Sequence, residues 1–240
     1  MTEMLFRKDP YARDAEARVT AITSEGGIVL DGSLFYPTSG GQPGDSGDLT
    51  WEGGRIEIGT TVKGDGADIV LVPAEPAALP AIGTRVSQRI TWDRRYRMMR
   101  MHTALHLLSV VIPLPVTGGA IGTDKGRLDF DMTEPPEDKE ALTETLNRLI
   151  GCGFAVSEEF ITDDELDANP GLVKTLSVQP PRGSGVIRLV RIGAGEKTAD
   201  LQPCGGTHVR NTAEIGRVRI GKIEKKGRQN RRVYLHLEDG

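Results

Sequence analysis

The chain has 240 residues, enough for one large domain or two domains of modest size. Hydrophobic residues make up 38% of it and charged residues 27%, which excludes a disordered or fibrous protein. The net charge of −4 argues against a general nucleic-acid-coating protein, because such proteins are strongly basic. The apolar run at residues 107–116 is too short for a membrane span, and residues 1–13 lack a signal-peptide core. We therefore expect a soluble, cytoplasmic protein with no membrane partner.

The amino-terminal part of the chain is predicted to be β-structure. Over residues 17–90, short apolar stretches alternate with Gly, Asp and Ser turns, and residues 63–66 have a sequence typical of a hairpin turn. Several short strands without a clear helix predict a small β-barrel or sandwich. Three prolines between residues 73 and 80 mark a linker. We place a β-barrel domain at residues 1–90.

The second part, residues 91–240, is predicted to be an α+β domain with an antiparallel sheet. From Asp93 to Ile112, apolar residues recur in steps of three and four, which predicts a helix with one buried face. Further elements are expected at residues 136–150 (helix), 162–168 (short helix with a capping box), and 186–192, 216–223 and 232–237 (strands). The whole chain is therefore assigned to the α+β class.

Three of the four histidines and one of the two cysteines fall into two pairs of equal spacing. His102 and His106 lie four apart on the predicted helix, so that both imidazoles share one face. Cys204 and His208 lie four apart in a glycine-rich segment that can curl to bring both side chains together. A lone histidine pair or cysteine is commonly core packing, but this combination fits the ligand set of a tetrahedral Zn²⁺ site. We predict one zinc ion per chain.

Residues around these ligands exclude two common classes of zinc protein, the zincin proteases and the zinc ribbons or fingers. A zincin protease has a glutamate directly after the first histidine of its helical pair, and this chain has Thr103 there. Short Cys-x-x-Cys pairs, typical of zinc ribbons and fingers, are absent. The sequence leaves open whether the site is structural, with four protein ligands, or catalytic, with a position for water or substrate.

Four ordered segments resemble the editing domain of alanyl-tRNA synthetase and its free-standing AlaX-type relatives. They are the glycine-rich residues 35–47, residues 102–108 (HTALHLL), residues 122–130 (GTDKGRLDF), and residues 204–209 (CGGTHV) with the following 211–216 (NTAEIG). The resemblance covers residues 17–238, which leaves no room for an aminoacylation domain, so the free-standing form is favoured. It implies a zinc-dependent hydrolase that removes the wrong amino acid from tRNA(Ala), chiefly serine and sometimes glycine, while sparing alanine. It also implies zinc ligation by His102, His106, Cys204 and His208.

Two further sets of site residues follow from this resemblance. Thr117 lies near the position of a polar, serine-selecting side chain in the family, with an ordinary loop threonine as the alternative. Gly40, Gly41 and Gln42 are candidates for lining the substrate pocket, with tight turns between strands as the alternative. Apart from the resemblance, the position of Asp200 four residues before Cys204 makes it a candidate partner for a ligand imidazole, with a turn or capping carboxylate as the alternative.

Basic residues gather just before the ligand face of the predicted helix and on the carboxy-terminal hairpin, where their phosphate contacts would hold the acceptor end of tRNA(Ala). The candidates for this contact are Arg94, Arg95, Arg97, Lys225, Lys226, Arg228 and Arg231. No obligate protein partner is evident. Two other functions stay open at this point: a zinc-stabilised RNA-binding module without catalysis, and a zinc hydrolase of another small ester or amide.

Overall fold

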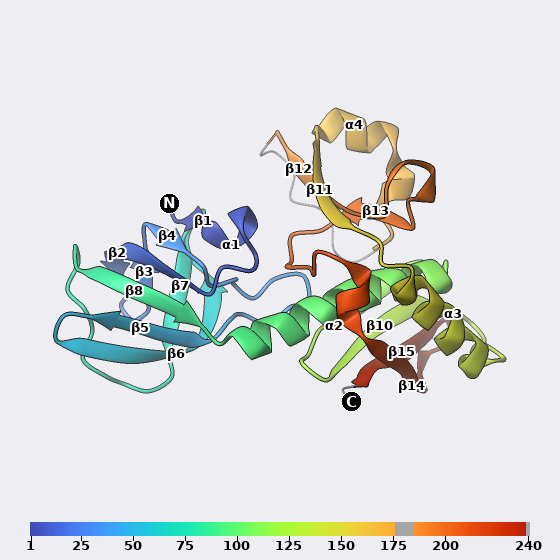
Figure 1. Cartoon of the computed structure of the whole chain (residues 1–240), viewed down its shortest axis with the longest axis horizontal. Helices are drawn as coiled ribbons and strands as arrows, with labels where there is room; N and C mark the ends of the chain where they lie inside the picture. The colour runs from blue at the N-terminus through green and yellow to red at the C-terminus, as the bar shows by residue number, and fades with distance from the viewer. Residues whose placement is uncertain (176–184, 239–240) are drawn as a thin grey trace. The chain divides into compact units, whose positions relative to one another are not determined.

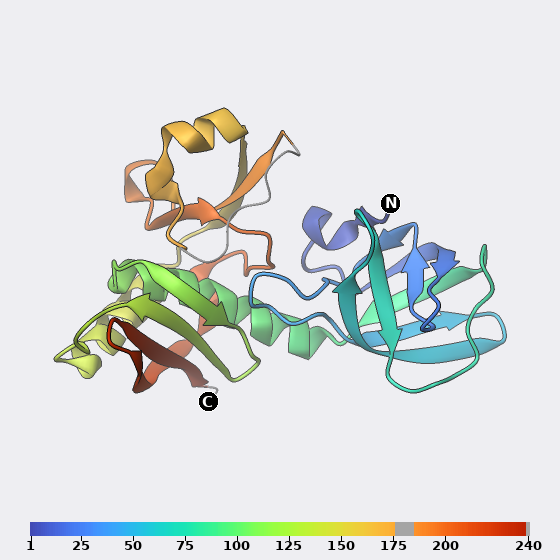
Figure 2. The same ribbon diagram turned by 180° about the vertical axis from the view of Figure 1, so that it is seen from behind.

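The computed structural model describes residues 1–175 and 185–238, and the chain has a mixed α+β fold, which confirms the predicted class. It divides into two compact units, Met1–Tyr96 and Arg97–Gly240. Figures 1 and 2 show the chain from opposite sides. Within the described ranges, none of the helices combines the length and the apolar character that a membrane crossing requires.

The first unit is built around a closed six-stranded barrel with the strand order β2-β3-β7-β6-β5-β8. Its elements are β1 (Glu3–Met4), α1 (Leu5–Lys8), β2 (Asp14–Ile22), β3 (Ile28–Leu30), β4 (Gly32–Ser33), β5 (Gly47–Trp51), β6 (Gly54–Lys63), β7 (Ile69–Pro73) and β8 (Arg85–Ile90). Alternate residues of each strand point inward, so Leu49, Ile58 and Leu71 are fully buried. Of the two predicted architectures, barrel and sandwich, the structure has the barrel. The predicted turn at residues 63–66 lies in the connection between β6 and β7.

The glycine-rich segment between β4 and β5 is a set of tight turns. Gly40 and Gly41 have φ values of 55° and 82°, and the backbone groups of Ser39 and Gln42 on either side exchange two hydrogen bonds. Two successive positive φ angles are typical of a type I′ hairpin turn, for which glycine is suited. At Gly44 a Cβ atom would lie 2.0 Å from the carbonyl oxygen of Thr61, so no other residue fits there. These contacts support the structural interpretation of this segment.

A buried ion pair ties this segment to the first turn of α2 (Trp92–Val111). The Arg95 side chain is 0% exposed and the Asp45 side chain 2% exposed; Nε of Arg95 donates to both Asp45 carboxylate oxygens, at 3.1 and 2.9 Å. The remaining guanidinium nitrogens donate to the backbone oxygens of Leu34 (2.6 Å) and Pro10 (3.1 Å). The prediction that Arg95 contacts tRNA is therefore corrected, because every polar group of this side chain is engaged in the core.

The second unit contains two antiparallel sheets, a four-stranded one ordered β14-β15-β10-β9 and a three-stranded one ordered β11-β12-β13. Its strands are β9 (Val116–Ala120), β10 (Lys125–Asp131), β11 (Val156–Ile161), β12 (Ile187–Ile192), β13 (Asp200–Pro203), β14 (Arg217–Gly227) and β15 (Asn230–Glu238). Besides α2 it holds α3 (Lys139–Gly151), α4 (Asp163–Ala168) and the 3-10 turns η1 (Pro170–Leu172), η2 (Gly195–Lys197) and η3 (Thr212–Ile215).

Helix α2 lies between the two sheets of this unit in both views (Figures 1 and 2). Every residue from Met101 to Ser109 is buried, so the predicted single buried face was wrong for this stretch. Packing on two sides explains the difference, because a helix covered on both sides is not limited to one apolar stripe. The two histidines that point into this environment therefore sit in a desolvated site.

Two other local predictions differ from the structure in their details. Helix α3 begins at Lys139 rather than at Pro136, because the Asp138 side chain accepts a hydrogen bond from the amide of Ala141 and caps the helix there. Helix α4 begins after Thr162, whose capping box is formed as predicted. Strands β9, β10, β11 and β13 were not predicted, although Leu128 and Phe130 of β10 alternate with polar residues.

The carboxylate of Asp129 on β10 gives a pH-dependent contribution to stability. It accepts hydrogen bonds from Arg232 (2.8 and 2.9 Å) and Arg127 (2.6 Å). Burial alone would raise the pKa of Asp129, but these two arginines lower it below its ordinary value. Because folding lowers this pKa, the stabilisation is complete above the unfolded value of about 4 and is lost as pH falls through the lower folded value.

We expect Asp129→Asn to lower the free energy of unfolding at pH 7 by about 1–2 kcal/mol, because the arginines lose a charged acceptor. The difference from the unsubstituted protein should shrink as pH falls below about 4. Urea unfolding at several pH values measures it, and Asp131→Asn, an exposed position on the same strand, serves as the control. A difference that stays constant down to pH 2 would contradict this account.

Candidate metal centre

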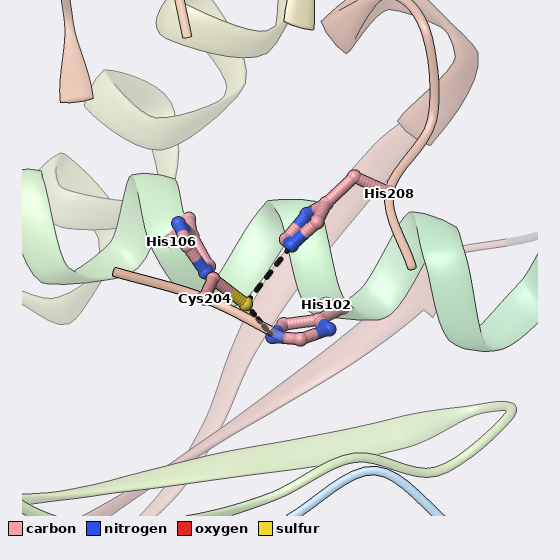
Figure 3. A group of neighbouring side chains, drawn as sticks. All are labelled: His102, His106, Cys204 and His208. Atoms are coloured by element: carbon pink, nitrogen blue, oxygen red, sulfur yellow. Dashed lines mark hydrogen bonds between the residues drawn. The ribbon is translucent and has the colours of Figure 1, made fainter. Parts of the chain in front are cut away.

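Four side chains that are far apart in the sequence converge in the second unit. His102 and His106 project from one face of α2, while Cys204 and His208 come from the loop after β13 (Figure 3). One nitrogen or sulfur atom from each residue lies within 4.8 Å of every other. Cys204 Sγ lies 3.2 Å from His208 Nε2 and 3.4 Å from His102 Nε2. The predicted convergence of these four residues is confirmed.

The spacing of these atoms fits a tetrahedral metal ion. With metal–nitrogen distances of about 2.0 Å and metal–sulfur distances of about 2.3 Å, tetrahedral zinc ligands stand roughly 3.5 Å apart. The two sulfur–nitrogen distances are close to that value. Three imidazole nitrogens and one thiolate are also the donor types that zinc prefers among biological cations. The residues present therefore fit a metal ion of this kind.

An arginine on β12 shapes the loop that carries Cys204 and His208. Nη1 of Arg188 donates to the carbonyl oxygens of Cys204 (2.5 Å) and Gly206 (3.2 Å), and Nη2 donates to Glu158 (2.6 Å). The Gly206 amide in turn faces Cys204 Sγ at 3.4 Å. By holding two carbonyls that are two residues apart, the guanidinium keeps the loop curled so that the sulfur points toward the helix.

Hydrogen bonds also fix the orientation of two of the imidazoles. Nδ1 of His106 donates to Asp200 Oδ2 at 2.9 Å, since a carboxylate only accepts, and this directs Nε2 of His106 toward the other ligands. Thr103 Oγ1 donates to the Met99 carbonyl at 2.9 Å and therefore accepts from His208 Nδ1 at 3.1 Å. Both imidazoles thus turn Nε2 toward the point where a metal ion would bind, and on His106 a metal ion would displace the Nε2 proton.

Burial and charge favour the metal-binding form of the sulfur. Burial alone would raise the pKa of the Cys204 thiol, but the neighbouring imidazoles of His102 and His208 keep it well below its usual value. Burial, followed by the charge of His102, lowers the pKa of His208 to about 3, so this imidazole is neutral at pH 7. A thiolate and a neutral imidazole are the protonation states that bind metal.

The carboxylate behind His106 is charged as well. Burial would raise the pKa of Asp200, but the hydrogen bonds and charges of His106 and Lys174 lower it to about 2. Burial lowers the pKa of His106, but the hydrogen bond to Asp200 and the neighbouring Cys204 raise it to about 9. Two buried anions therefore attract positive charge to the point where the four ligand atoms meet, which a divalent cation would supply.

Comparison with known proteins places the chain in a family. An alanyl-tRNA editing protein AlaX-M from Methanosarcina acetivorans is 37% identical over 249 residues, and the alignment covers 100% of both chains. The chain belongs to the AlaX-M family of alanyl-tRNA editing proteins. An AlaX-M protein from Saccharolobus solfataricus is 35% identical over 247 residues, covering 99% of this chain and 100% of that protein.

Similarity extends to the synthetases, as the sequence resemblance predicted. An alanine–tRNA ligase from Pyrobaculum neutrophilum is 34% identical over 234 residues, which cover 93% of this AlaX-M chain and 25% of the ligase. The family described as the threonyl and alanyl tRNA synthetase second additional domain matches residues 187–234, which include Cys204 and His208. The family described as class II (A) tRNA synthetases matches residues 9–94.

The other predicted site residues of this AlaX-M chain lie as follows. Thr117 is on β9, where its hydroxyl accepts a hydrogen bond from the Asn230 side chain at 3.0 Å. Gly40, Gly41 and Gln42 form the tight turn of the first unit, with Gln42 fully buried. Their predicted role in the substrate pocket stays a prediction. The remaining histidine and cysteine, His236 on β15 and the exposed Cys152 after α3, lie outside the ligand cluster.

The basic residues predicted to contact tRNA divide into two groups. Lys225, Lys226 and Arg228 are exposed on β14 and the turn after it. Arg231 is corrected, because it is 6% exposed and its guanidinium donates to the backbone oxygens of Gly227 (3.2 Å) and Thr133, which holds the hairpin turn.

Arg94 and Arg97 have protein partners as well. Arg94 donates to the carbonyl oxygen of Gly44 at 2.7 Å, and Arg97 forms an ion pair with Asp124. Lys225 and Arg228 are therefore the best placed of the predicted phosphate contacts, while the exposed Lys226 pairs with Glu224 at 3.0 Å.

Sequence reasoning missed several residues that hold this AlaX-M metal centre. Asp200 contacts a ligand imidazole, His106, as one of its two interpretations predicted, whereas Thr103, noted in the sequence only for standing in place of a glutamate, also contacts His208. Arg188 and Lys174 were not singled out at all. The available signal was position: Thr103 directly follows His102, and Asp200 precedes Cys204 by four residues in a short strand.

Proposed function

We propose that this chain is a trans-editing aminoacyl-tRNA deacylase, which hydrolyses the ester of tRNA(Ala) charged with the wrong amino acid. Serine is the proposed main substrate and glycine a second one, while Ala-tRNA(Ala) is spared. Two observations support this function together: the buried four-ligand centre, and full-length similarity to relatives named alanyl-tRNA editing proteins. Such an enzyme would act where tRNA is charged and used, so we propose a cytoplasmic location.

We propose zinc as the resident metal, held by His102, His106, Cys204 and His208. When bound there, the ion would hold the amino group of the substrate, or hold and polarise a water molecule, beside the ester carbonyl. Residues of the chain itself orient the ligands. Asp200 is not placed to act as general base, because its two oxygens already accept from His106, Gln202 and Lys174. Its part is to keep the proton on His106 Nδ1 and so to keep Nε2 directed at the ligand cluster.

Discrimination between serine and alanine needs a polar group that the serine hydroxyl satisfies. A site of that kind rejects alanine, because a buried polar atom is then left without a partner, and it disfavours glycine for the same reason, which makes glycine the minor substrate. Thr117 is our candidate for this group, and its hydroxyl is already oriented by Asn230. The exposed Lys225, Lys226 and Arg228 are the proposed contacts to the phosphates of the tRNA acceptor end.

The proposed function predicts selective turnover. Purified protein loaded with zinc should deacylate Ser-tRNA(Ala) at least about 100-fold faster than it deacylates Ala-tRNA(Ala), since hydroxyl-reading sites reach such ratios. The measurement follows release of labelled serine, glycine or alanine from tRNA(Ala) over time, beside a buffer control. If Ser-tRNA(Ala) stays as stable as in buffer while the protein still binds tRNA, the chain is instead a non-catalytic RNA-binding module.

A further inference from the structure

The carboxylate of Asp200 has more partners than one metal ligand requires. Its side chain is 0% exposed. Oδ2 accepts from His106 Nδ1 (2.9 Å) and Gln202 Nε2 (2.8 Å), and Oδ1 accepts from Lys174 Nζ (2.5 Å). Among these partners, Lys174 alone brings a permanent charge from outside the ligand cluster. A buried carboxylate without such a cation would be costly, so this lysine supports the anion that orients His106.

Lys174 is itself held in place from both sides. Val173 before it packs against the apolar cluster of Leu166, Ile187 and Leu189. Its own carbonyl oxygen accepts a hydrogen bond from the Val116 amide at 2.9 Å, and the following residue pairs with Val116 as a parallel bridge. The backbone of this segment is therefore anchored, and the ammonium group reaches Asp200 from a fixed point. Its side chain remains 29% exposed, so replacing it leaves the core packing intact.

We propose that Lys174 is a positioning residue of the metal centre, which acts through Asp200 to hold His106 in its metal-binding orientation. The chain of contacts runs from the Lys174 ammonium to Oδ1 of Asp200, and from Oδ2 of Asp200 to Nδ1 of His106. Lys174 touches neither the metal ligands' donor atoms nor the substrate in this assignment. Its backbone contact with Val116 also joins the centre to the start of β9, which carries Thr117.

Removing the Lys174 ammonium group is therefore expected to weaken metal binding, although two hydrogen bonds and Asp200 separate it from the ligand His106. Without the ammonium group, Oδ1 of Asp200 loses its charged donor, and the carboxylate can rotate away from His106. The imidazole then loses part of the constraint that keeps Nε2 directed at the other ligands. Partners of this kind typically change metal affinity by 10–100-fold when they are removed.

Zinc affinity of the metal-free protein, measured by competition with a chromophoric chelator, tests the proposal without tRNA. We expect Lys174→Met to lower the affinity by about 10-fold and Lys174→Arg, which keeps the charge, to lower it by less than about 3-fold. Lys197→Met, at an exposed lysine of the same unit, serves as the control and should bind zinc normally. Should Lys174→Met fail to fold, Lys174→Gln replaces it in the comparison.

A double-mutant cycle identifies the route of the effect. If Lys174 acts through Asp200, adding Lys174→Met to Asp200→Asn should change the affinity less than about twofold beyond Asp200→Asn alone. Unchanged affinity in Lys174→Met, or an equal loss in both backgrounds, would overturn the proposal. The proposal rests on the metal centre of the proposed function, but its readout is separate: failure of deacylation with normal zinc behaviour would leave it standing.

Discussion

Replacing Cys204 with alanine is expected to reduce zinc affinity at least about 100-fold and to remove deacylation of Ser-tRNA(Ala). Structural zinc sites bind with about 10–16 kcal/mol, so one of four ligands accounts for about 3 kcal/mol, or roughly 100-fold. Cys204 also supplies the negative charge among the four ligands, because the neighbouring imidazoles of His102 and His208 lower the pKa of its thiol. Loss of this thiolate leaves three imidazoles in a buried site with less attraction for a cation.

The chain offers a matched control in its second cysteine. Cys152 is exposed at the carboxyl end of α3 and its thiol donates only to the carbonyl of Arg148, at 3.3 Å. Cys152→Ala should therefore keep both zinc and activity. Metal content after gel filtration and chelator competition measure the first, and the deacylation assay measures the second. Full zinc occupancy in Cys204→Ala would show that the ligand set drawn from the structure is wrong.

The four ligands could be predicted because the features that mark them lie close together in the sequence. Equal spacing of His102 with His106, and of Cys204 with His208, is visible without knowing the fold, and so is the helix that carries the first pair. The supporting contacts are long-range: Thr103 meets His208 across 105 positions, and Asp200 meets His106 across 94. No periodicity marks such pairs, so Asp200 could only be offered as a candidate beside its common role in turns and caps, and the contact of Thr103 with His208 was not predicted.

The same limit explains the tRNA contacts that had to be corrected. A run of arginines in the first turns of a helix is typical of an exposed basic surface, and nothing near Arg95 in the sequence distinguishes it from Arg94 or Arg97. Its partner Asp45 lies 50 positions away, in a segment whose glycines allow close approach to the barrel. Charge clustering correctly predicted an exposed basic surface on the β14 hairpin, where the lysines are exposed. It failed for Arg95, because this side chain pairs with the buried Asp45 carboxylate.

Replacing Asp45 with asparagine is expected to lower the free energy of unfolding by about 3–5 kcal/mol, because it leaves the buried Arg95 charge uncompensated. Arg95 has no exposed surface and could not turn its guanidinium to water without opening the core. Asp45 Oδ2 also accepts from the Tyr36 amide at 2.7 Å, so the substitution weakens the turn segment as well. Urea unfolding followed by circular dichroism measures the change.

An exposed pair provides the control for this prediction. Asp48 contacts Arg55 at 2.8 Å, but the Arg55 side chain is 70% exposed, so Asp48→Asn should cost less than about 1 kcal/mol. The double variant Asp45→Asn/Arg95→Met should be more stable than Asp45→Asn alone, because an apolar side chain has no buried charge to leave unpaired. If the single and double variants lose equal stability, the loss comes from the altered turn at Asp45 and not from the unpaired guanidinium.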